Sequence, residues 1–421
     1  MNYRRTKIVV GVCGLVAAAL LVFVGAGALP RIEGADATAD SAATKTSLPD
    51  LVSKVTRAIV RVDVWRPYQV KDAATGKENP NFAWSTGTGF VIRCERVGGD
   101  ATTDDVECDV VTNNHVVTLD VRHDWTAPAK LLCVMYGIDV TSAAIQGRDA
   151  SADLAMIRLR ARAPKGKTPS ALSWADPDGI RVGDDVVAIG YARDLRGRPT
   201  VTRGIIGATR RTEPSFGDEQ ALFADLIQSD ASINHGNSGG PLINLRGEVV
   251  GVNTYSIPPT VDVAGKNNIN VDVTEGIFFT RSSRTAKPFI EQIARNGSVA
   301  RLDLGCSNIT LVEPFIRFLG WPEAVFVRNA PATSLGGKAG IQSRDLIIAV
   351  GSAASRPAAP VPSQETKITS VGELNDALGL RGGDACIWVR GIRLPAAMLT
   401  ALDAGQCPPY VSGEPYIAFL R

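Results

Sequence analysis

Short apolar runs separated by turn residues recur along most of the chain and predict β-strands. In residues 58–65, valines at every second position alternate with Arg61 and Asp63, which is the period-two pattern of a half-buried strand. Further apolar runs of strand length lie at residues 130–135, 153–159, 185–190, 201–208 and 249–252. Because turn residues separate these runs, the pattern is typical of two small β-barrels.

A helical pattern follows these strands. Phe289, Ile290 and Ile293 recur on one face of residues 285–296, and Gly297 suits the C-terminal cap of a helix. We expect this helix to close the β-rich part of the chain.

The N-terminal part has a different pattern. Residues 8–29 contain no charged residue and follow Arg4, Arg5 and Lys7. A run of this length can span a bilayer, and the flanking charges favour a cytoplasmic N-terminus. The alternative is a cleaved signal peptide, with the small residues at 26–28 as its cleavage site. We favour an uncleaved anchor, because the apolar run is longer than the usual signal-peptide core, and the rest of the chain is exported in either case.

Composition narrows the class of protein. A chain of 421 residues is long enough for more than one domain. The net charge of +2, with 21% charged residues, shows no basic excess, so nothing indicates a nucleic-acid partner. Residues 31–47 are rich in Ala, Asp, Thr and Ser and are expected to form a linker.

The cysteines agree with export. Cys13 lies in the apolar N-terminal segment, and the others are Cys94, Cys108, Cys133, Cys306, Cys386 and Cys407. An even number outside the membrane indicates disulfides. We predict Cys94–Cys108, which brackets a polar insertion between two strands, and next Cys386–Cys407. The absence of a Cys-x-x-Cys pair or a nearby histidine argues against a structural zinc site.

A glycine-rich loop at residues 234–242 is the candidate catalytic segment. Gly236, Gly239 and Gly240 flank Ser238 and allow the backbone to turn its N–H groups inward. A nucleophilic serine needs such groups, because they stabilise the oxyanion that forms on the substrate carbonyl. A glycine-rich turn can also contain an ordinary serine, so the partners of Ser238 must decide.

The chain has three histidines that could act as the base. His115 follows a β-favouring run and two asparagines, whereas His123 lies in a polar segment typical of a solvated loop. His235 is too close to Ser238 in the same tight loop to be held by a buried carboxylate as well. His115 is therefore the candidate base.

A carboxylate is needed to orient the imidazole of that base. Asp153 stands immediately before the apolar run 154–159 and supplies one. The order His115, Asp153, Ser238 is the order of chymotrypsin-like proteases and differs from the order in subtilisin and in α/β-hydrolases.

Three segments resemble the signatures of the HtrA/Deg serine proteases: residues 112–117, 153–157 and 236–242. Residues 87–91, 182–190 and 201–206 match in support, and the resemblance covers about residues 48–394. It implies a mainly β chain with a chymotrypsin-like double β-barrel protease domain at residues 48–298 and a PDZ domain at residues 299–394. A transmembrane segment at residues 1–30 and a linker at 31–47 would come before them, and residues 395–421 have no counterpart and suggest an irregular tail.

The resemblance assigns the chemistry to residues of this chain. His115 would take the proton of Ser238, Asp153 would hold the imidazole, and the N–H groups of Gly236, Asn237 and Ser238 would stabilise the oxyanion. This chemistry requires no cofactor and no metal.

Three segments put parts of the resemblance in doubt. His235 stands where the family usually has proline, and residues 255–275 form a longer segment than the family's specificity loop. Residues 210–221 correspond to a regulatory loop, although an ordinary surface loop is the alternative. These departures keep a second interpretation open, in which the fold is an inactive chaperone or peptide-sensing scaffold.

The second domain contains a candidate peptide site. Leu304, Gly305 and Cys306 resemble the loop by which PDZ domains hold a terminal carboxylate, although the family usually has an aliphatic residue at the position of Cys306. The capping-box spacing at residues 370–373 predicts a helix that lines the groove. A peptide would add as a strand beside residues 306–309. The alternative is a PDZ-like domain that only packs on the protease.

The family also implies partners and a location. By resemblance, we expect a bacterial envelope protein, anchored in the inner membrane with its catalytic domain in the periplasm, or secreted there if the N-terminal segment is cleaved. The expected substrates are unfolded or damaged polypeptides, with C-terminal peptides at the PDZ domain. A homotrimer is expected on the same ground.

Overall fold

The computed structural model describes residues 47–71, 76–118, 129–195, 197–215, 218–256, 276–310, 323–359, 361–381, 384, 386–394 and 414–420. The chain divides into two units, Met1–Lys45 and Thr46–Arg421, and all described residues belong to the second. In this part of the chain, no helix is long and apolar enough to cross a membrane, and the candidate anchor at residues 8–29 lies outside it.

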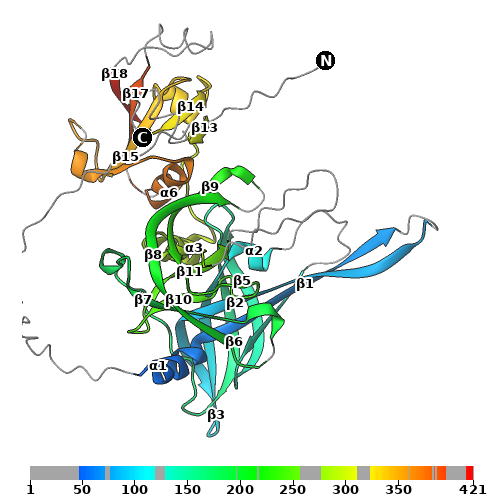
Figure 1. Cartoon of the computed structure of the whole chain (residues 1–421). Coiled ribbons are helices and arrows are strands. Elements are labelled where there is room, and N and C mark those ends of the chain that lie inside the picture. Colours follow the sequence, from blue (N-terminus) through cyan, green and yellow to red (C-terminus); the bar gives the residue numbers. More distant parts are fainter. Residues whose placement is uncertain are drawn as a thin grey trace, which may run out of the picture. The chain divides into compact units, whose positions relative to one another are not determined.

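The first part of the described chain is an antiparallel six-stranded sheet in the order β4-β1-β2-β3-β6-β5. Its strands are β1 (Ile59–Lys71), β2 (Glu78–Gly99), β3 (Thr103–Thr112), β4 (Lys130–Met135), β5 (Asp139–Asp149) and β6 (Leu154–Pro164). The alternation predicted for residues 58–65 is confirmed, because Val60, Val62 and Val64 are buried in the core while Arg61 and Asp63 form an ion pair outside it. Beyond the sheet, β1 and β2 continue together as a long hairpin arm (Figure 1).

The second part is a closed barrel in the order β10-β11-β12-β9-β8-β7. Its strands are β7 (Asp185–Gly190), β8 (Thr200–Ser215), β9 (Asp218–Ser229), β10 (Pro241–Asn244), β11 (Val249–Ser256) and β12 (Phe278–Ser282). Val186, Ala188, Leu242 and Val250 fill its interior. The mainly β organisation expected from the apolar runs is therefore confirmed, although only one of the two expected barrels is closed and the other is a six-stranded sheet.

Helices connect and flank these sheets. They are α1 (Leu48–Val55), α2 (Asn114–Val117) and α3 (Ser283–Asn296), with short 3-10 turns at η1 (Thr56–Ala58), η2 (Pro177–Gly179) and η3 (Ala192–Asp194). The predicted helix 285–296 is confirmed as α3, which buries Phe289, Ile290 and Ile293. It ends at Gly297, whose φ of 78° is the left-handed cap that glycine adopts without strain.

One predicted disulfide is present, between Cys94 on β2 and Cys108 on β3, which face each other in the strand register. Cys133 and Cys386 are buried free thiols, and Cys407, the expected partner of Cys386, lies outside the described residues.

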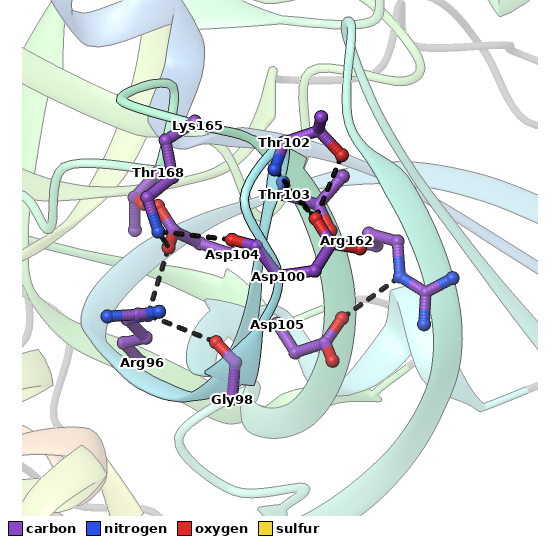
Figure 2. A network of polar contacts seen from close by, with 10 residues as sticks. All are labelled: Arg96, Gly98, Asp100, Thr102, Thr103, Asp104, Asp105, Arg162, Lys165 and Thr168. Atoms are coloured by element: carbon purple, nitrogen blue, oxygen red, sulfur yellow. Dashed lines mark hydrogen bonds and ion pairs between the residues drawn. The ribbon is translucent and has the colours of Figure 1, made fainter.

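Polar contacts fix the hairpin that joins β2 to β3 (Figure 2). The carboxylate of Asp100 accepts hydrogen bonds from the N–H groups of Thr102 and Thr103 and from the Thr102 hydroxyl. These bonds hold the pKa of Asp100 well below its usual range. Nearby, Lys165 donates a hydrogen bond to Asp104 and Arg162 donates one to Asp105. Cations at the end of β6 therefore hold the β3 side of the hairpin tip.

A separate sheet with its own core follows, in the order β13-β14-β15-β17-β18, with β16 paired to β15. Its elements are β13 (Ser307–Thr310), β14 (Val325–Asn329), α5 (Leu335–Lys338), β15 (Leu346–Ala353), η4 (Pro362–Gln364), β16 (Glu365–Lys367), α6 (Val371–Leu380), β17 (Cys386–Arg393) and β18 (Glu414–Phe419). The helix expected at residues 370–378 is confirmed as α6, and the Ser370 hydroxyl accepts from the Glu373 N–H as its capping box predicts.

The expectation of an irregular C-terminal tail is wrong for residues 414–420. Residues Glu414–Phe419 form β18 beside β17, and both Ala418 in this strand and Leu420 after it are buried. The alternation of Pro415, Ile417 and Phe419 with buried Ala418 is short, and only the neighbouring strand shows that it pairs. Residues 395–413 lie outside the described part.

Candidate active site

His115 and Asp153 meet directly. His115 lies in α2, immediately after β3, and Asp153 stands at the start of β6, the strand that pairs with β3. The Nδ1 atom of His115 lies 2.7 Å from one Asp153 carboxylate oxygen, and the backbone N–H of His115 donates to the other at 2.9 Å. Both oxygens of the carboxylate are therefore used to hold the histidine.

The backbone around Asp153 is shaped to present this carboxylate. Asp153 has a φ of 52°, a left-handed conformation that is uncommon for a residue other than glycine. The side chain of Asn113 donates to the Asp153 carbonyl at 2.8 Å, and Asp149 accepts from the Ala152 N–H at 2.8 Å. These bonds keep the turn before β6 in place while the Asp153 side chain stays buried.

The electrostatics of the pair favour a charged imidazole. Burial is the largest single influence on His115 and opposes its protonation, but the charge of Asp153 and the hydrogen bond to it together raise the pKa of His115. A carboxylate on Nδ1 also favours the tautomer in which that nitrogen carries the proton, which leaves Nε2 as the basic atom.

Ser238 lies in the loop between β9 and β10. A hydrogen bond connects this loop to β2, close to the segment that carries His115. The Thr88 N–H donates to the Ser238 carbonyl at 2.8 Å. Gly87 lies between Val116 and Ser238, because a Cβ on Gly87 would meet Val116 at 2.5 Å and the Ser238 carbonyl at 3.1 Å. The Ser238 hydroxyl donates to the Thr254 carbonyl at 3.2 Å.

Three successive carbonyl groups of the serine loop accept hydrogen bonds from other groups of the protein. The His235 carbonyl accepts from the Arg193 N–H at 2.6 Å, the Gly236 carbonyl accepts from the Thr88 hydroxyl at 2.6 Å, and the Asn237 carbonyl accepts from the Gly240 N–H at 3.0 Å. In a trans peptide the C=O and the following N–H point in opposite directions. Among the described residues, the N–H groups of Gly236 and Ser238 have no backbone acceptor, and neither do those of Asn234 and His235; Gly236 and Ser238 are the two that flank Asn237, next to the nucleophile.

Asn237 differs from its two neighbours. Its N–H, which the sequence analysis included among the oxyanion donors, donates to the Asn234 carbonyl at 2.9 Å. That bond closes the turn at Gly236, whose φ is +95°. The geometry therefore favours Gly236 and Ser238 as the two donors.

The remaining histidines and loops lie as follows. His235 is exposed, and the candidate segment containing His123 lies outside the described residues. Residues 257–275, most of the expected specificity segment, also lie outside them. The expected regulatory segment 210–221 contributes the paired ends of β8 and β9, in which Pro214 faces Leu222.

In the C-terminal sheet (β13–β18), the candidate peptide site adjoins a cavity of about 220 Å³. Its lining combines Leu304 and Cys306 with Leu374 and Leu378 of α6, and it also includes polar residues, namely Ser151, Arg301, Asp303 and Asn375. Gly305 has a φ of +64°, and burial raises the pKa of the Cys306 thiol. Within the described residues, no group of three or more His, Cys, Asp or Glu side chains could hold a metal ion.

Sequence reasoning overlooked the residues that support the serine loop. Thr88 lies in the stretch 87–91 that was noted only as a supporting match, and Arg193 lies in a turn with a φ of 49°. A buried hydroxyl between two glycines was the available signal for Thr88, whereas nothing local indicates the role of Arg193.

The fold and site agree with known proteins. Residues 87–252 match the family model of the trypsin-like peptidase domain. The match includes His115, Asp153 and the loop that carries Ser238.

Curated relatives are named as proteases of one family. The chain is 29% identical over 283 residues to "Serine protease Do-like HtrB" of Bacillus subtilis, covering 65% of this chain and 57% of that protein. It is 35% identical over 243 residues to a "Probable periplasmic serine endoprotease DegP-like" of Rhizobium meliloti, covering 57% and 42%. The chain is thus similar to proteins named as HtrA and DegP-like serine proteases, and it spans about half the length of these relatives.

Solved structures share the fold. "HtrA-type protease AlgW with decapeptide" matches with a TM-score of 0.54 at 21% identity, covering 89% of this chain and 98% of that one. "HtrA-type protease AlgW with tripeptide" matches with a TM-score of 0.53 at 23% identity, covering 88% and 97%.

Proposed function

We propose that this protein is a serine endopeptidase that cleaves unfolded or damaged polypeptides. The observation that carries the proposal is the contact of His115 with Asp153 beside a serine loop that leaves the Gly236 and Ser238 N–H groups open. The homology to named serine proteases supports the same reaction.

In the proposed mechanism, Nε2 of His115 takes the proton of the Ser238 hydroxyl as the oxygen attacks the peptide carbonyl. The N–H groups of Gly236 and Ser238 bind the oxyanion, and the imidazolium returns its proton to the leaving amine. Asp153 keeps the ring in place and stabilises its positive charge. Water then attacks the acyl-serine while His115 takes a proton from it. The imidazolium returns that proton to the Ser238 oxygen as the acid product leaves.

The proposal is tested with fluorescently labelled casein as an unfolded substrate. We expect cleavage by the native chain and none by Ser238→Ala, with unchanged circular dichroism in the variant. A fluorophosphonate probe should label the native chain and leave Ser238→Ala unlabelled. Equal suppression of aggregation by both proteins, with cleavage by neither, would instead support the scaffold interpretation.

We further propose that residues 299–394 form a PDZ domain that binds C-terminal peptides in the cavity between Cys306 and α6. Two features support it: the three leucines in the lining of the cavity, Leu304, Leu374 and Leu378, and the β13 edge, which has no other strand beyond it in the described sheet. The AlgW structures, which are named with a decapeptide and with a tripeptide, support peptide binding as a property to test in this chain. Fluorescence anisotropy of a C-terminal peptide library measures this, and Leu378→Glu should abolish binding.

We place the protein in the bacterial envelope, with residues 1–30 as membrane anchor, residues 48–298 as the protease domain and a homotrimer as the assembly. The relatives named as periplasmic support the compartment, and the uncharged segment 8–29 supports the anchor. N-terminal sequencing of the mature protein from membranes separates anchor from cleaved signal peptide. Light scattering in detergent gives the number of subunits.

A further inference from the structure

Thr88 lies at the point where the two halves of the protease region meet. It belongs to β2 of the first sheet, and its side chain is fully buried. The serine loop is 148 residues away in the sequence, yet the Thr88 hydroxyl donates to the Gly236 carbonyl at 2.6 Å. A buried threonine between two glycines is therefore in direct contact with the loop that carries the nucleophile.

The same hydroxyl makes a second bond. It accepts from the Tyr191 N–H at 2.9 Å, at the end of β7. Tyr191 also limits Gly236 from the other side, since a Cβ on Gly236 would lie 2.1 Å from the Tyr191 carbonyl oxygen. One oxygen atom thus links β2, the end of β7 and the serine loop.

The backbone of Thr88 adds two more links. Its N–H donates to the Ser238 carbonyl at 2.8 Å, and its carbonyl accepts from the Thr112 hydroxyl at 2.7 Å. Thr112 is the last residue of β3, just before the segment that carries His115. The nucleophile segment and the base segment are therefore both bonded to Thr88.

Gly236 needs such support because its own backbone does not select one conformation. With no Cβ, glycine adopts φ values of either sign at little cost, so the peptide planes around Gly236 can rotate. The bond from Arg193 fixes the plane before Gly236, and the bond from the Thr88 hydroxyl fixes the plane after it. The first plane carries the Gly236 N–H, and the second connects it to Asn237 and Ser238, so both must be fixed for the two donors to keep their positions relative to each other.

We propose that Thr88 is a positioning residue of the oxyanion hole: its hydroxyl holds the Gly236–Asn237 peptide, which lies between the two donor residues, so that the serine loop keeps the Gly236 and Ser238 N–H groups facing the developing oxyanion. Thr88 contacts no substrate atom in this role. The inference rests on the proposed peptidase activity and names a residue that the reaction needs outside the triad.

The test compares Thr88→Val, which keeps the shape and removes the hydroxyl, with Thr88→Ser, which keeps the hydroxyl. For Thr88→Val we expect kcat on labelled casein to fall about 10- to 100-fold with KM changed less than about threefold, because the loss lies in oxyanion stabilisation. The rate of fluorophosphonate labelling should fall in parallel, since that reaction also places negative charge in the hole. Thr88→Ser should recover kcat to within about threefold of the native value.

Thr285→Val is the matched control. Thr285 is equally buried, and its hydroxyl donates to Asp225 at 2.7 Å, away from the serine loop. It should lower the melting temperature while kcat stays at the native value. If Thr88→Val does not fold, Thr88→Cys replaces it, because a thiol is a weak donor.

The outcomes separate the two proposals. No cleavage and no labelling by the native chain would remove the peptidase function itself. Cleavage by the native chain at the same kcat as folded Thr88→Val, or as Thr88→Cys if the valine variant does not fold, would overturn the role of Thr88. A rise in the KM of Thr88→Val with an unchanged kcat would also contradict it.

Discussion

At the scale of single residues, Asp153 determines how His115 can act. The carboxylate accepts from the His115 backbone and contacts Nδ1, so the ring has one orientation and its basic nitrogen faces away from the acid. The raised pKa of His115 follows from the same contact. In the folded protein, therefore, the imidazole binds its proton more tightly than an ordinary histidine does.

This contact predicts the pH dependence of cleavage. The base must be neutral, so kcat/KM should rise with pH through a midpoint above the ordinary histidine pKa of about 6.5. Asp153→Asn should lower that midpoint and reduce kcat by about 10⁴-fold, because the amide favours the wrong tautomer. Casein cleavage measured across the pH range checks both effects. A midpoint below that of free histidine in the native chain would contradict the assignment of His115.

The same shift has a consequence for stability. A raised folded-state pKa means that the protonated pair stabilises the fold fully below the ordinary histidine pKa and loses this contribution as pH rises through the raised value. Unfolding measured on His115→Gln, which lacks the charge, should lack this step.

Gly236 supplies the next prediction. Gly236→Ala places a Cβ at 2.1 Å from the Tyr191 carbonyl at a φ of +95°, so the loop must shift and the oxyanion donor with it. We expect kcat to fall by about 10²- to 10³-fold. Gly137→Ala is the control, because Gly137 also has a positive φ, of +73°, but open space around it. That variant should lose some stability and keep native kcat; equal kcat in both variants would contradict the role of the Gly236 peptide.

At the scale of elements, the β2–β3 hairpin is held covalently as well as by charge. Cys94 and Cys108 face each other across the two strands that lead to Thr88 and to His115. The bridge therefore limits how far the hairpin can open in the unfolded chain. It lies in the half of the molecule that presents the base.

Removing the bridge should destabilise the fold. For Cys94→Ala combined with Cys108→Ala, with a sequence separation of 14 between the cysteines, we expect a loss of about 3 kcal/mol in the free energy of unfolding. Urea unfolding with and without reductant measures it. Reductant should destabilise the native chain and leave the double variant unchanged; a native chain insensitive to reductant would show that the bridge does not contribute.

At the scale of the whole molecule, a buried ion pair joins the protease barrel to the C-terminal sheet. Arg281 on β12 donates through Nη2 to both carboxylate oxygens of Asp376 on α6, at 2.6 and 2.7 Å. Arg281 also donates through Nη1 to the Ala224 carbonyl. Burial raises the pKa of Asp376 to about 6, which shows how strongly this site opposes an isolated charge.

This pair predicts an asymmetric response to mutation. Asp376→Ala should cost about 3–5 kcal/mol, because it removes the carboxylate that accepts two hydrogen bonds from the buried guanidinium. Arg281→Met combined with Asp376→Leu should cost much less, since both members of the bonded pair are then replaced by apolar side chains. Chemical unfolding of the single and double variants measures the difference. A single variant as stable as the double variant would mean that solvent reaches the site.

Much of the fold and site could be predicted from local patterns. The strand alternation around Val62 and the cysteines flanking the β2–β3 hairpin could be predicted because each depends on spacing within a segment. The residues His115, Asp153 and Ser238 could be selected because each stands in a characteristic local motif and the three follow one another in the order of chymotrypsin-like proteases. The C-terminal strand was missed because residues 414–419 gain their structure from pairing with β17, and a sequence pattern does not identify a pairing partner.

The sequence by itself determined which chemical groups are present and which segments are strands, helices and tight turns, because periodicity and side-chain chemistry are properties of neighbouring residues. Only the tertiary structure decided how those groups share their hydrogen bonds. It assigned the Asn237 N–H to a turn, brought the Thr88 hydroxyl to Gly236 across 148 residues, and joined Arg281 to Asp376 across 95. Such contacts depend on the packing of distant elements, which a local sequence pattern does not contain. In the catalytic loop they also have a chemical consequence, because a peptide N–H that is already bonded, such as that of Asn237, is not available to the oxyanion.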